Sequence, residues 1–239
     1  MRTDHAGHLR QLLARLPADR RALLTPAADC TQLRATCVTD PVWLSEQIRL
    51  RGLIWGIGDR HVLATLWWYS ASAALVRPSI AALASTGLAL SARLEDIVLH
   101  HTPSSRFTGS HSTATTGTDL DTIAAQLRES LEVAINAVRS HTTGRPRPLW
   151  ALAADAICTS ALWVGEAIGR PDPAWQLADS LIRRLGAELP APRPPAGYGS
   201  QPTSGRVSNR VSCCLLYRVP DQGSCARCPR NTSGSGPAT

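Results

Sequence analysis

The stretch WALAADAICTSALWVGEAI (residues 150–168) decides the fold of this chain. Its apolar residues occupy nearly every face of a helix, so the segment is predicted to lie at the centre of the fold rather than on its surface. Gly169 follows it directly and is a typical helix stop. The other helices are expected to pack around this segment.

Helical signals continue on both sides of the central segment. Asp40 and Pro41 are predicted to be the N-cap and first residue of one helix. Repeats of apolar residues at spacings of three and four define the others. In chain order the predicted helices cover residues 9–16, 40–51 (followed by Gly52), 61–76, 78–87 (restarted by Pro78), 120–138 (closed by Gly144) and 172–185 (capped by Asp172 and Pro173, ended by Gly186).

A short β structure is predicted between these helices. Ile97-Val98-Leu99 is rich in β-formers and precedes the turn-like residues 102–105, which indicates a strand and a hairpin. The Ser, Thr and Gly residues of 108–118 predict an exposed loop. His100 and His101 are adjacent on the predicted strand, so they point to opposite faces and are expected to be a solvated pair rather than metal ligands.

The predicted fold class is mainly α (α+β): a helical body, a small β-hairpin and a short C-terminal cysteine-rich module. The body spans residues 1–189, and a linker with five prolines and three glycines spans 190–205. The module covers 206–230, and a disordered tail covers 231–239. The module is too short to bury a core of its own, so metal binding and docking onto the body are expected to order it.

Composition gives little reason to expect a nucleic-acid or membrane partner. All 25 basic residues are Arg and the net charge is +7, but no Arg-rich run or aromatic-interleaved basic patch occurs. The N-terminus is polar and is not a secretory segment. The apolar window 62–76 is shorter than the roughly 20 residues that span a bilayer. We expect no transmembrane segment and a cytoplasmic location, where clustered thiols stay reduced and available to metal.

Four of the seven cysteines, Cys213, Cys214, Cys225 and Cys228, lie within sixteen residues. Four thiolates can hold an iron–sulfur cluster or a tetrahedral zinc ion. Only Cys225 and Cys228 have the spacing of a zinc turn. The adjacent pair can reach a single metal only across a sharp bend, whereas a two-iron cluster spreads its ligands over two metals. Iron–sulfur, zinc, and a disulfide or inert thiols all remain open from spacing.

Other possible sites are better explained by packing. Cys30, Cys37 and Cys158 are predicted to be small core hydrophobes. The aromatic run at residues 67–69 is expected to belong to the core, and Gly56-Ile57-Gly58 is expected to be a turn rather than a phosphate site. No nucleophile elbow, metalloprotease motif or paired-carboxylate cluster occurs.

The pattern C-C-x₁₀-C-x₂-C, with Arg210 before it, Tyr217 inside it and Pro229 after it, resembles the C-terminal signature of the FhuF-like ferric-siderophore reductases. A weaker likeness extends over most of residues 43–230. Its features are Trp55-Gly56, an Asp-Arg pair at 59–60 and the strand-like stretch Leu-Glu-Asp-Ile-Val-Leu. The resemblance implies that Cys213, Cys214, Cys225 and Cys228 bind a [2Fe–2S] cluster.

The same resemblance implies an iron–sulfur oxidoreductase that reduces the Fe³⁺ of a ferric siderophore to Fe²⁺ in the cytosol. Its partners would be the ferric siderophore and an electron donor of ferredoxin or flavin-reductase type, and no acid or base residue beyond the cluster ligands is required. Arg210, Arg218 and Arg227 would favour the reduced cluster and attract an anionic partner, or they form an ordinary solvated rim. The alternatives are a zinc-binding structural module and a one-electron carrier without its own substrate.

Overall fold

The computed structural model describes residues 5–186, 189–191, 210–225 and 228–230. The helices are α1 (His5–Arg15), α2 (Ala18–Arg21), α3 (Pro41–Trp55), α4 (Arg60–Thr86), α5 (Leu120–Arg139), α6 (Arg147–Ala167) and α7 (Pro171–Leu185), with 3₁₀ turns η1 (Ala35–Thr39) and η2 (Leu216–Arg218). The strands are β1 (Thr31–Arg34), β2 (Ala89–Leu90), β3 (Ile97–His101), β4 (Phe107–Ser112) and β5 (Thr115–Gly117). The prediction of a mainly α fold with a small β part is confirmed.

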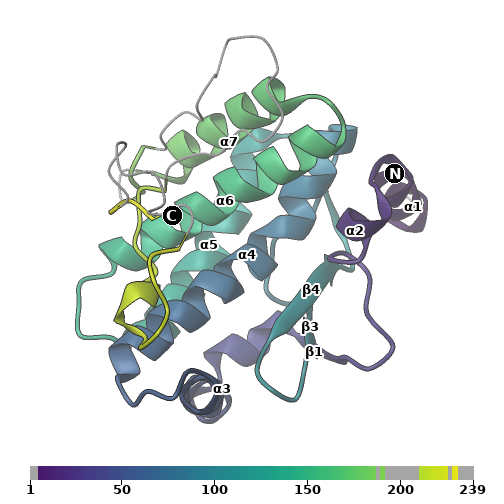
Figure 1. Cartoon of the computed structure of the whole chain (residues 1–239). Helices are drawn as coiled ribbons and strands as arrows, with labels where there is room; N and C mark the ends of the chain where they lie inside the picture. Colours follow the sequence, from purple (N-terminus) through teal and green to yellow (C-terminus); the bar gives the residue numbers. More distant parts are fainter. Residues whose placement is uncertain (1–4, 187–188, 192–209, 226–227, 231–239) are drawn as a thin grey trace, which may run out of the picture.

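Helix α6 lies at the centre of the fold, as its sequence predicts. It packs most extensively against α4 and α7, and α5 completes the helical layer (Figure 1). Among the described helices it is the one that is long and apolar enough to cross a membrane, and 83% of its apolar window is buried inside the protein. Such burial is typical of the core helix of a globular protein, in line with the prediction of no transmembrane segment.

Helix α4 is one continuous helix, and the prediction of two helices broken at Pro78 is wrong. A proline inside a helix removes the N–H that the carbonyl four residues earlier would accept. Here the hydroxyl of Ser110, on β4, donates a 2.6 Å hydrogen bond to that carbonyl, on Ala74. The neighbouring strand therefore replaces the missing bond, and the helix runs through the proline.

Helix α3 begins where predicted but ends four residues later than predicted. The Asp40 carboxylate accepts hydrogen bonds from the N–H groups of Val42 and Trp43, at 2.8 and 3.2 Å, which confirms the N-cap. The helix passes through Gly52 and ends at Gly56, whose φ of 65° is left-handed. A side chain at Gly52 would approach the backbone oxygen of Ile57 to 3.0 Å, so this glycine serves packing rather than termination.

Two further helix boundaries differ from prediction. Helix α5 stops at Arg139, before Gly144. Helix α7 starts at Pro171 rather than behind an Asp172 cap, because a proline already occupies its first turn at 171. Its predicted end at Gly186 is confirmed, as is the stop of α6 before Gly169, where φ is 71°.

The β part is larger than predicted. β1, β3 and β4 form an antiparallel sheet, and β2 pairs with β5. The β3–β4 hairpin is confirmed. The prediction of an exposed loop over 108–118 is wrong, because β4 and β5 occupy most of it and Ser110 and Ser112 are buried. Their hydroxyls donate to backbone carbonyls, which allows polar residues to line an interior strand.

The histidine pair is also buried, so the prediction of a solvated pair is wrong. The two rings do diverge: His100 Nε2 lies 2.7 Å from His111 Nδ1, while His101 packs against the rings of Trp43 and Phe107. Burial lowers the pKa of both imidazoles, which favours their neutral forms. A hydrogen-bonded neutral imidazole is compatible with an interior strand.

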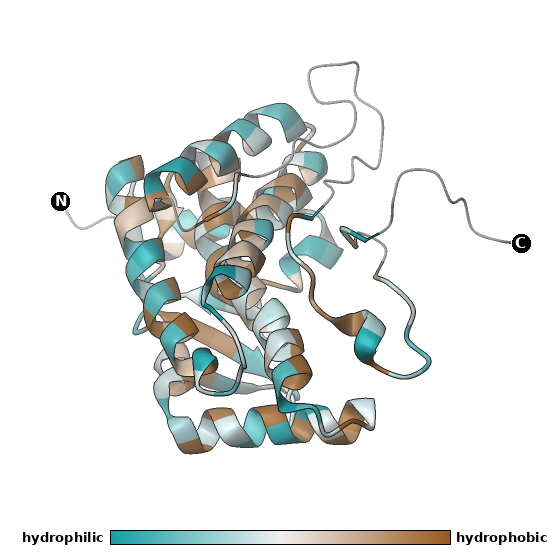
Figure 2. Ribbon diagram, turned by 90° about the vertical axis from the view of Figure 1, so that its left-hand side faces the viewer, coloured by the Kyte–Doolittle hydropathy of each residue, from teal (hydrophilic) through white to brown (hydrophobic). Residues whose placement is uncertain are grey.

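The described part of the cysteine module lies along α4 and α6, on the side of the molecule opposite α1 (Figures 1 and 2). Cys214 and Val219 are buried in the main hydrophobic core. Figure 2 also shows α3 crossing the bottom of the molecule, close to the level of this module. The predicted linker, apart from residues 190 and 191, and the predicted tail lie outside the described residues.

Candidate metal centre

The cysteine module is fastened to the body by one carboxylate of α6. Asp155 accepts hydrogen bonds from the backbone N–H groups of Val211 and Ser212, at 3.1 and 3.0 Å, and from the Ser212 hydroxyl. Its Oδ2 atom also lies 3.6 Å from the guanidinium Nε of Arg210. The side chains of Asp155 and Arg210 are only 7% and 4% exposed, so this is a buried, charge-assisted attachment.

The sulfur atoms of the four predicted ligands lie close together in this module. The sulfur atoms of Cys214 and Cys225 lie 3.9 Å apart. Cys228 contacts the sulfur atoms of both Cys225 and Cys213. The four sulfur atoms therefore form one group, in which Cys213 interacts with Cys214 and Cys228, and Cys225 with the same two residues.

The backbone supplies the sharp bend that the adjacent cysteines require. Leu215, directly after Cys214, has a left-handed φ of 65°. Its N–H donates to the sulfur of Cys213. At the other end, the N–H of Cys228 donates to the carbonyl of Cys225 at 2.8 Å and closes a tight turn. The chain thus reverses at both cysteine pairs.

The thiols differ in how easily they ionise. Burial raises the pKa of Cys213, against the opposing effect of the Leu215 N–H. Burial and the neighbouring Cys214 sulfur raise the pKa of Cys225 to about 11. Burial also acts to raise the pKa of Cys228, but hydrogen bonds from the Arg230 backbone and from neighbouring side chains outweigh it and lower that pKa. Metal binding would have to displace protons from these sulfurs.

Arg210 contacts one of the thiols directly. Its Nη1 lies 3.6 Å from the Cys225 sulfur, and its guanidinium stacks over the Tyr69 ring at 4.3 Å. Desolvation opposes its charge, but Tyr69, Cys214, Asp155 and Cys225 raise its pKa on balance. The guanidinium therefore stays positive beside the sulfurs.

Of the other predicted arginines, Arg218 lies within the described residues and takes a different position. Arg218 points to the body and forms a 2.9 Å ion pair with Asp59, the N-cap residue of α4. Arg230 stacks over the Tyr217 ring at 4.3 Å. Arg227 lies outside the described residues.

The donor set fits an iron–sulfur cluster and does not exclude zinc. Two thiolates on one tetrahedral metal, each about 2.3 Å from it, are about 3.8 Å apart. The 3.9 Å between Cys214 and Cys225 matches that spacing. This spacing is common to a zinc site and to each iron of a two-iron cluster.

The remaining cysteines lie apart from this segment. Cys158 is buried in the core, Cys37 packs against its edge, and Cys30 is half-buried. Burial raises the pKa of Cys37 to about 12, and that of Cys158 above its ordinary range as well. These thiols behave as the small core residues that were predicted, except that Cys30 is not in the core.

Sequence reasoning missed Asp155, the residue that positions the whole module. A signal was present, because a carboxylate in the middle of a helix that is apolar on nearly every face requires a buried partner. The sequence alone could not show which residues are the partners of Asp155. Tyr69 was assigned to the core together with Trp67 and Trp68, which are buried, but it is 43% exposed and carries Arg210.

Comparison with known proteins leaves the chain without an assigned family. No protein-family model matches it, and no curated protein matches it either.

Proposed function

We propose that this protein is a cytosolic ferric-siderophore reductase in which Cys213, Cys214, Cys225 and Cys228 hold a [2Fe–2S] cluster. The proposal joins the resemblance of the C-terminal motif to the geometry around it. The observation that carries it is the group of four thiols beside Arg210, fixed to α6 by Asp155. When bound, such a cluster supplies one electron at a time, which chelated Fe³⁺ can accept to become Fe²⁺.

The residues of this chain provide ligation, charge and placement. The N–H groups of Leu215 and Arg230 point to the sulfurs of Cys213 and Cys228, and such donors stabilise thiolate charge. Arg210 adds a fixed positive charge, which favours the reduced form of a cluster with net negative charge. No proton has to move for the electron to pass, so the absence of a general acid or base from the motif is no obstacle.

Placement is the second requirement. Asp155 fixes the module against the body through backbone and side-chain contacts, so the sulfurs keep a defined position relative to α4 and α6. The bond from Arg218 to Asp59 and the burial of Val219 add a second attachment. An acceptor bound to the body would therefore meet the cluster at a fixed separation.

The first test is metal content. Protein purified anaerobically from an iron-replete host should be brown, should bleach with dithionite, and should contain about two irons and two sulfides per chain. Replacing any one of Cys213, Cys214, Cys225 or Cys228 with Ser should destabilise the cluster. Cys30→Ser and Cys37→Ser are matched controls and should retain it. A colourless protein with one zinc ion per chain would establish the zinc-binding module instead.

The second test separates a reductase from a simple electron carrier. Dithionite-reduced protein is mixed anaerobically with ferric siderophores of hydroxamate, catecholate and carboxylate type, and released Fe²⁺ is trapped with a coloured chelator. A reductase should show saturable, siderophore-selective reoxidation. Rates that follow only the driving force of each chelate, without saturation, would identify a carrier.

A further inference from the structure

A small pocket lies between α3, α4 and the turn of the β3–β4 hairpin. Its volume is about 360 Å³, and it is lined by Arg51, Ile54, Trp55, Ser70, Arg106 and Phe107. This is near the lower end of the volumes of ligand pockets, roughly 300–1,000 Å³. The pocket is therefore large enough for a small molecule or for one arm of a larger one.

Arg51 is buried in this pocket without a partner. Its residue is 7% exposed, and its enclosed Nε has no hydrogen-bond acceptor. Within the described ranges no carboxylate pairs with Arg51 or with Arg106, the second guanidinium of the pocket. The indole Nε1 of Trp55 is likewise enclosed and unpartnered. Buried donors are nearly always satisfied in a folded protein, so this set points to an acceptor that the described residues do not supply.

The charge in the pocket has one sign. Burial, and then the nearby Arg106, lower the pKa of Arg51 to about 10. At neutral pH the Arg51 guanidinium therefore stays protonated, and its burial costs free energy while it lacks a counter-ion. An anion entering the pocket would relieve this cost.

The apolar walls of the pocket indicate which kind of anion would fit it. Ile54, Trp55 and Phe107 offer apolar surface, and Trp55 and Phe107 offer ring faces or edges. A guanidinium presents N–H groups in a planar fork that matches a carboxylate. A flat organic carboxylate satisfies both the donors and the walls, whereas an inorganic anion would leave the walls uncovered.

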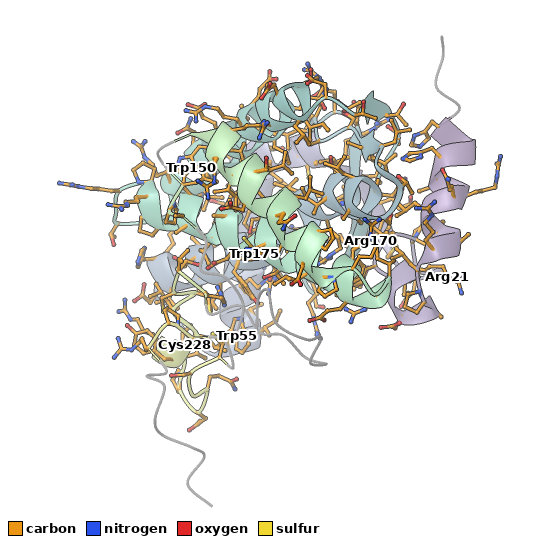
Figure 3. All side chains as sticks on the ribbon, turned by 90° about the horizontal axis from the view of Figure 1, so that it is seen from above. Arg21, Trp55, Trp150, Arg170, Trp175 and Cys228 are labelled. Atoms are coloured by element: carbon orange, nitrogen blue, oxygen red, sulfur yellow. The ribbon has the colours of Figure 1, made fainter. Side chains whose placement is uncertain are left out.

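The pocket adjoins a second hollow, which lies nearer to Arg210 and the thiols. The second hollow, of about 260 Å³, shares Ser70 and Phe107 with the pocket and extends to Tyr69 and Asp155. These last two residues both contact Arg210, which in turn contacts Cys225. Figure 3 shows Trp55 and Cys228 on the same side of the molecule, away from Arg21 and Arg170. The two hollows therefore share a wall, and the second one is lined by two residues that contact Arg210.

We propose that the pocket around Arg51 and Arg106 binds a small organic carboxylate, or the carboxylate-bearing arm of a larger ligand. The carboxylate pairs with the Arg51 guanidinium and receives charge from Arg106, and its apolar body lies against Trp55 and Phe107. This binding requires no metal. If the protein has the proposed reductase function, this ligand is part of the electron acceptor; that one identification rests on the proposed function.

The test is calorimetric titration of the full-length protein with benzoate and with benzamide, which match in shape and differ in charge. Benzoate should bind saturably and benzamide at least tenfold more weakly. Arg51→Gln and Arg106→Gln should each weaken benzoate binding at least tenfold. Arg49→Gln is the matched control, since Arg49 lies on the same helix but is exposed and paired with Glu46. It should bind benzoate as the wild type does.

Several results would overturn this inference. They are the absence of saturable benzoate binding, equal binding of benzamide, and an equal loss in Arg49→Gln. If Arg51→Gln fails to fold, Arg106→Gln decides the question, because Arg106 is an exposed residue of the hairpin turn. Benzoate binding is measured on the metal-free protein and siderophore reduction on the protein purified with its metal, which keeps the two proposals apart. Benzoate binding without siderophore reduction would refute only the reductase, and siderophore reduction without benzoate binding would refute only the pocket.

Discussion

At the scale of single residues, the most consequential pair is Asp155 and Arg210. They lie 55 positions apart in the chain, and both are buried. Breaking a buried ion pair by removing one partner leaves the other charge without compensation, which typically costs 3–5 kcal/mol. Asp155 also caps two backbone N–H groups of the module, so its loss affects position as well as stability.

Asp155→Ala is therefore expected to lower the free energy of unfolding by about 3–5 kcal/mol and to reduce iron retention. Urea unfolding and iron analysis measure the two effects. Asp179→Ala is the matched control, because Asp179 forms an exposed-side ion pair with Arg183 on α7 and such pairs contribute only about 0–1 kcal/mol. Equal losses in both variants would contradict the role given to Asp155.

The buried histidines predict a pH dependence. Burial, and then His111, lower the pKa of His100 from 6.5 to about 4. Between these pH values the unfolded chain binds a proton that the folded protein rejects. His100 therefore contributes its full stability above pH 6.5 and loses it as the pH falls towards 4.

We expect the urea concentration at the unfolding midpoint to decrease when the pH is lowered from about 7.5 to about 5. The decrease should be smaller in His100→Gln, because glutamine does not titrate. Comparing the two proteins removes the contribution of the thiols, which both share. The pKa values of His101 and His111 are also lowered by burial, so part of the slope should remain in the variant. Identical slopes in the two proteins would show that His100 is not the responsible group.

At the scale of elements, the continuity of α4 depends on a bond from β4. Pro78 has no N–H to donate to the Ala74 carbonyl within the helix. The Ser110 hydroxyl donates the hydrogen bond to that carbonyl instead. Helix and strand are thus coupled at one buried point. A helix that looks broken in sequence is kept whole by a residue 36 positions away.

Ser110→Ala should leave the Ala74 carbonyl without a donor and cost about 1–3 kcal/mol of unfolding free energy. Adding Pro78→Ala restores an N–H at position 78 and should recover much of that loss. Ser79→Ala is the matched control, because the Ser79 hydroxyl is buried in the same helix without a partner and its removal should cost little. Chemical denaturation of the wild type, Ser110→Ala, Pro78→Ala and the double variant gives the coupling energy. Additive effects of Ser110→Ala and Pro78→Ala would refute the exchange of donors.

At the scale of the whole molecule, the cysteine module depends on the body more than the body depends on the module. In the described ranges all seven α-helices precede residue 190, and most of the main core is built from them. The module contributes Cys214 and Val219 to that core and contacts it through Asp155 and Asp59.

Truncation after Gly205 should therefore leave a folded helical body without iron. Far-UV circular dichroism should keep the helical signal, while the melting temperature falls because the Cys214 and Val219 contacts are lost. Asp155 becomes accessible to water in the truncated chain, so its charge is not left buried. Loss of helical signal would show that body and module form one inseparable unit.

Much of the fold follows from local sequence. The central helix at 150–168, the caps at Asp40 and Gly186, and the β-hairpin are all read from periodicity and from residues within a few positions of each other, and the structure confirms them. The candidate cysteines were also identifiable, because four thiols in one short segment are a local pattern. Local patterns suffice where the stabilising contacts are themselves local.

Only the tertiary structure decided the rest, because the decisive contacts join residues far apart in the chain. Pro78 stays inside a helix because of Ser110, and the histidine strand is buried because other elements cover it. Asp155 reaches the module across more than fifty positions. Arg51 and Arg106 line one pocket, and their spacing in the sequence does not predict it. A buried charge or an interrupted hydrogen bond is tolerated only where folding brings a partner to it, and that partner is fixed by packing rather than by sequence proximity.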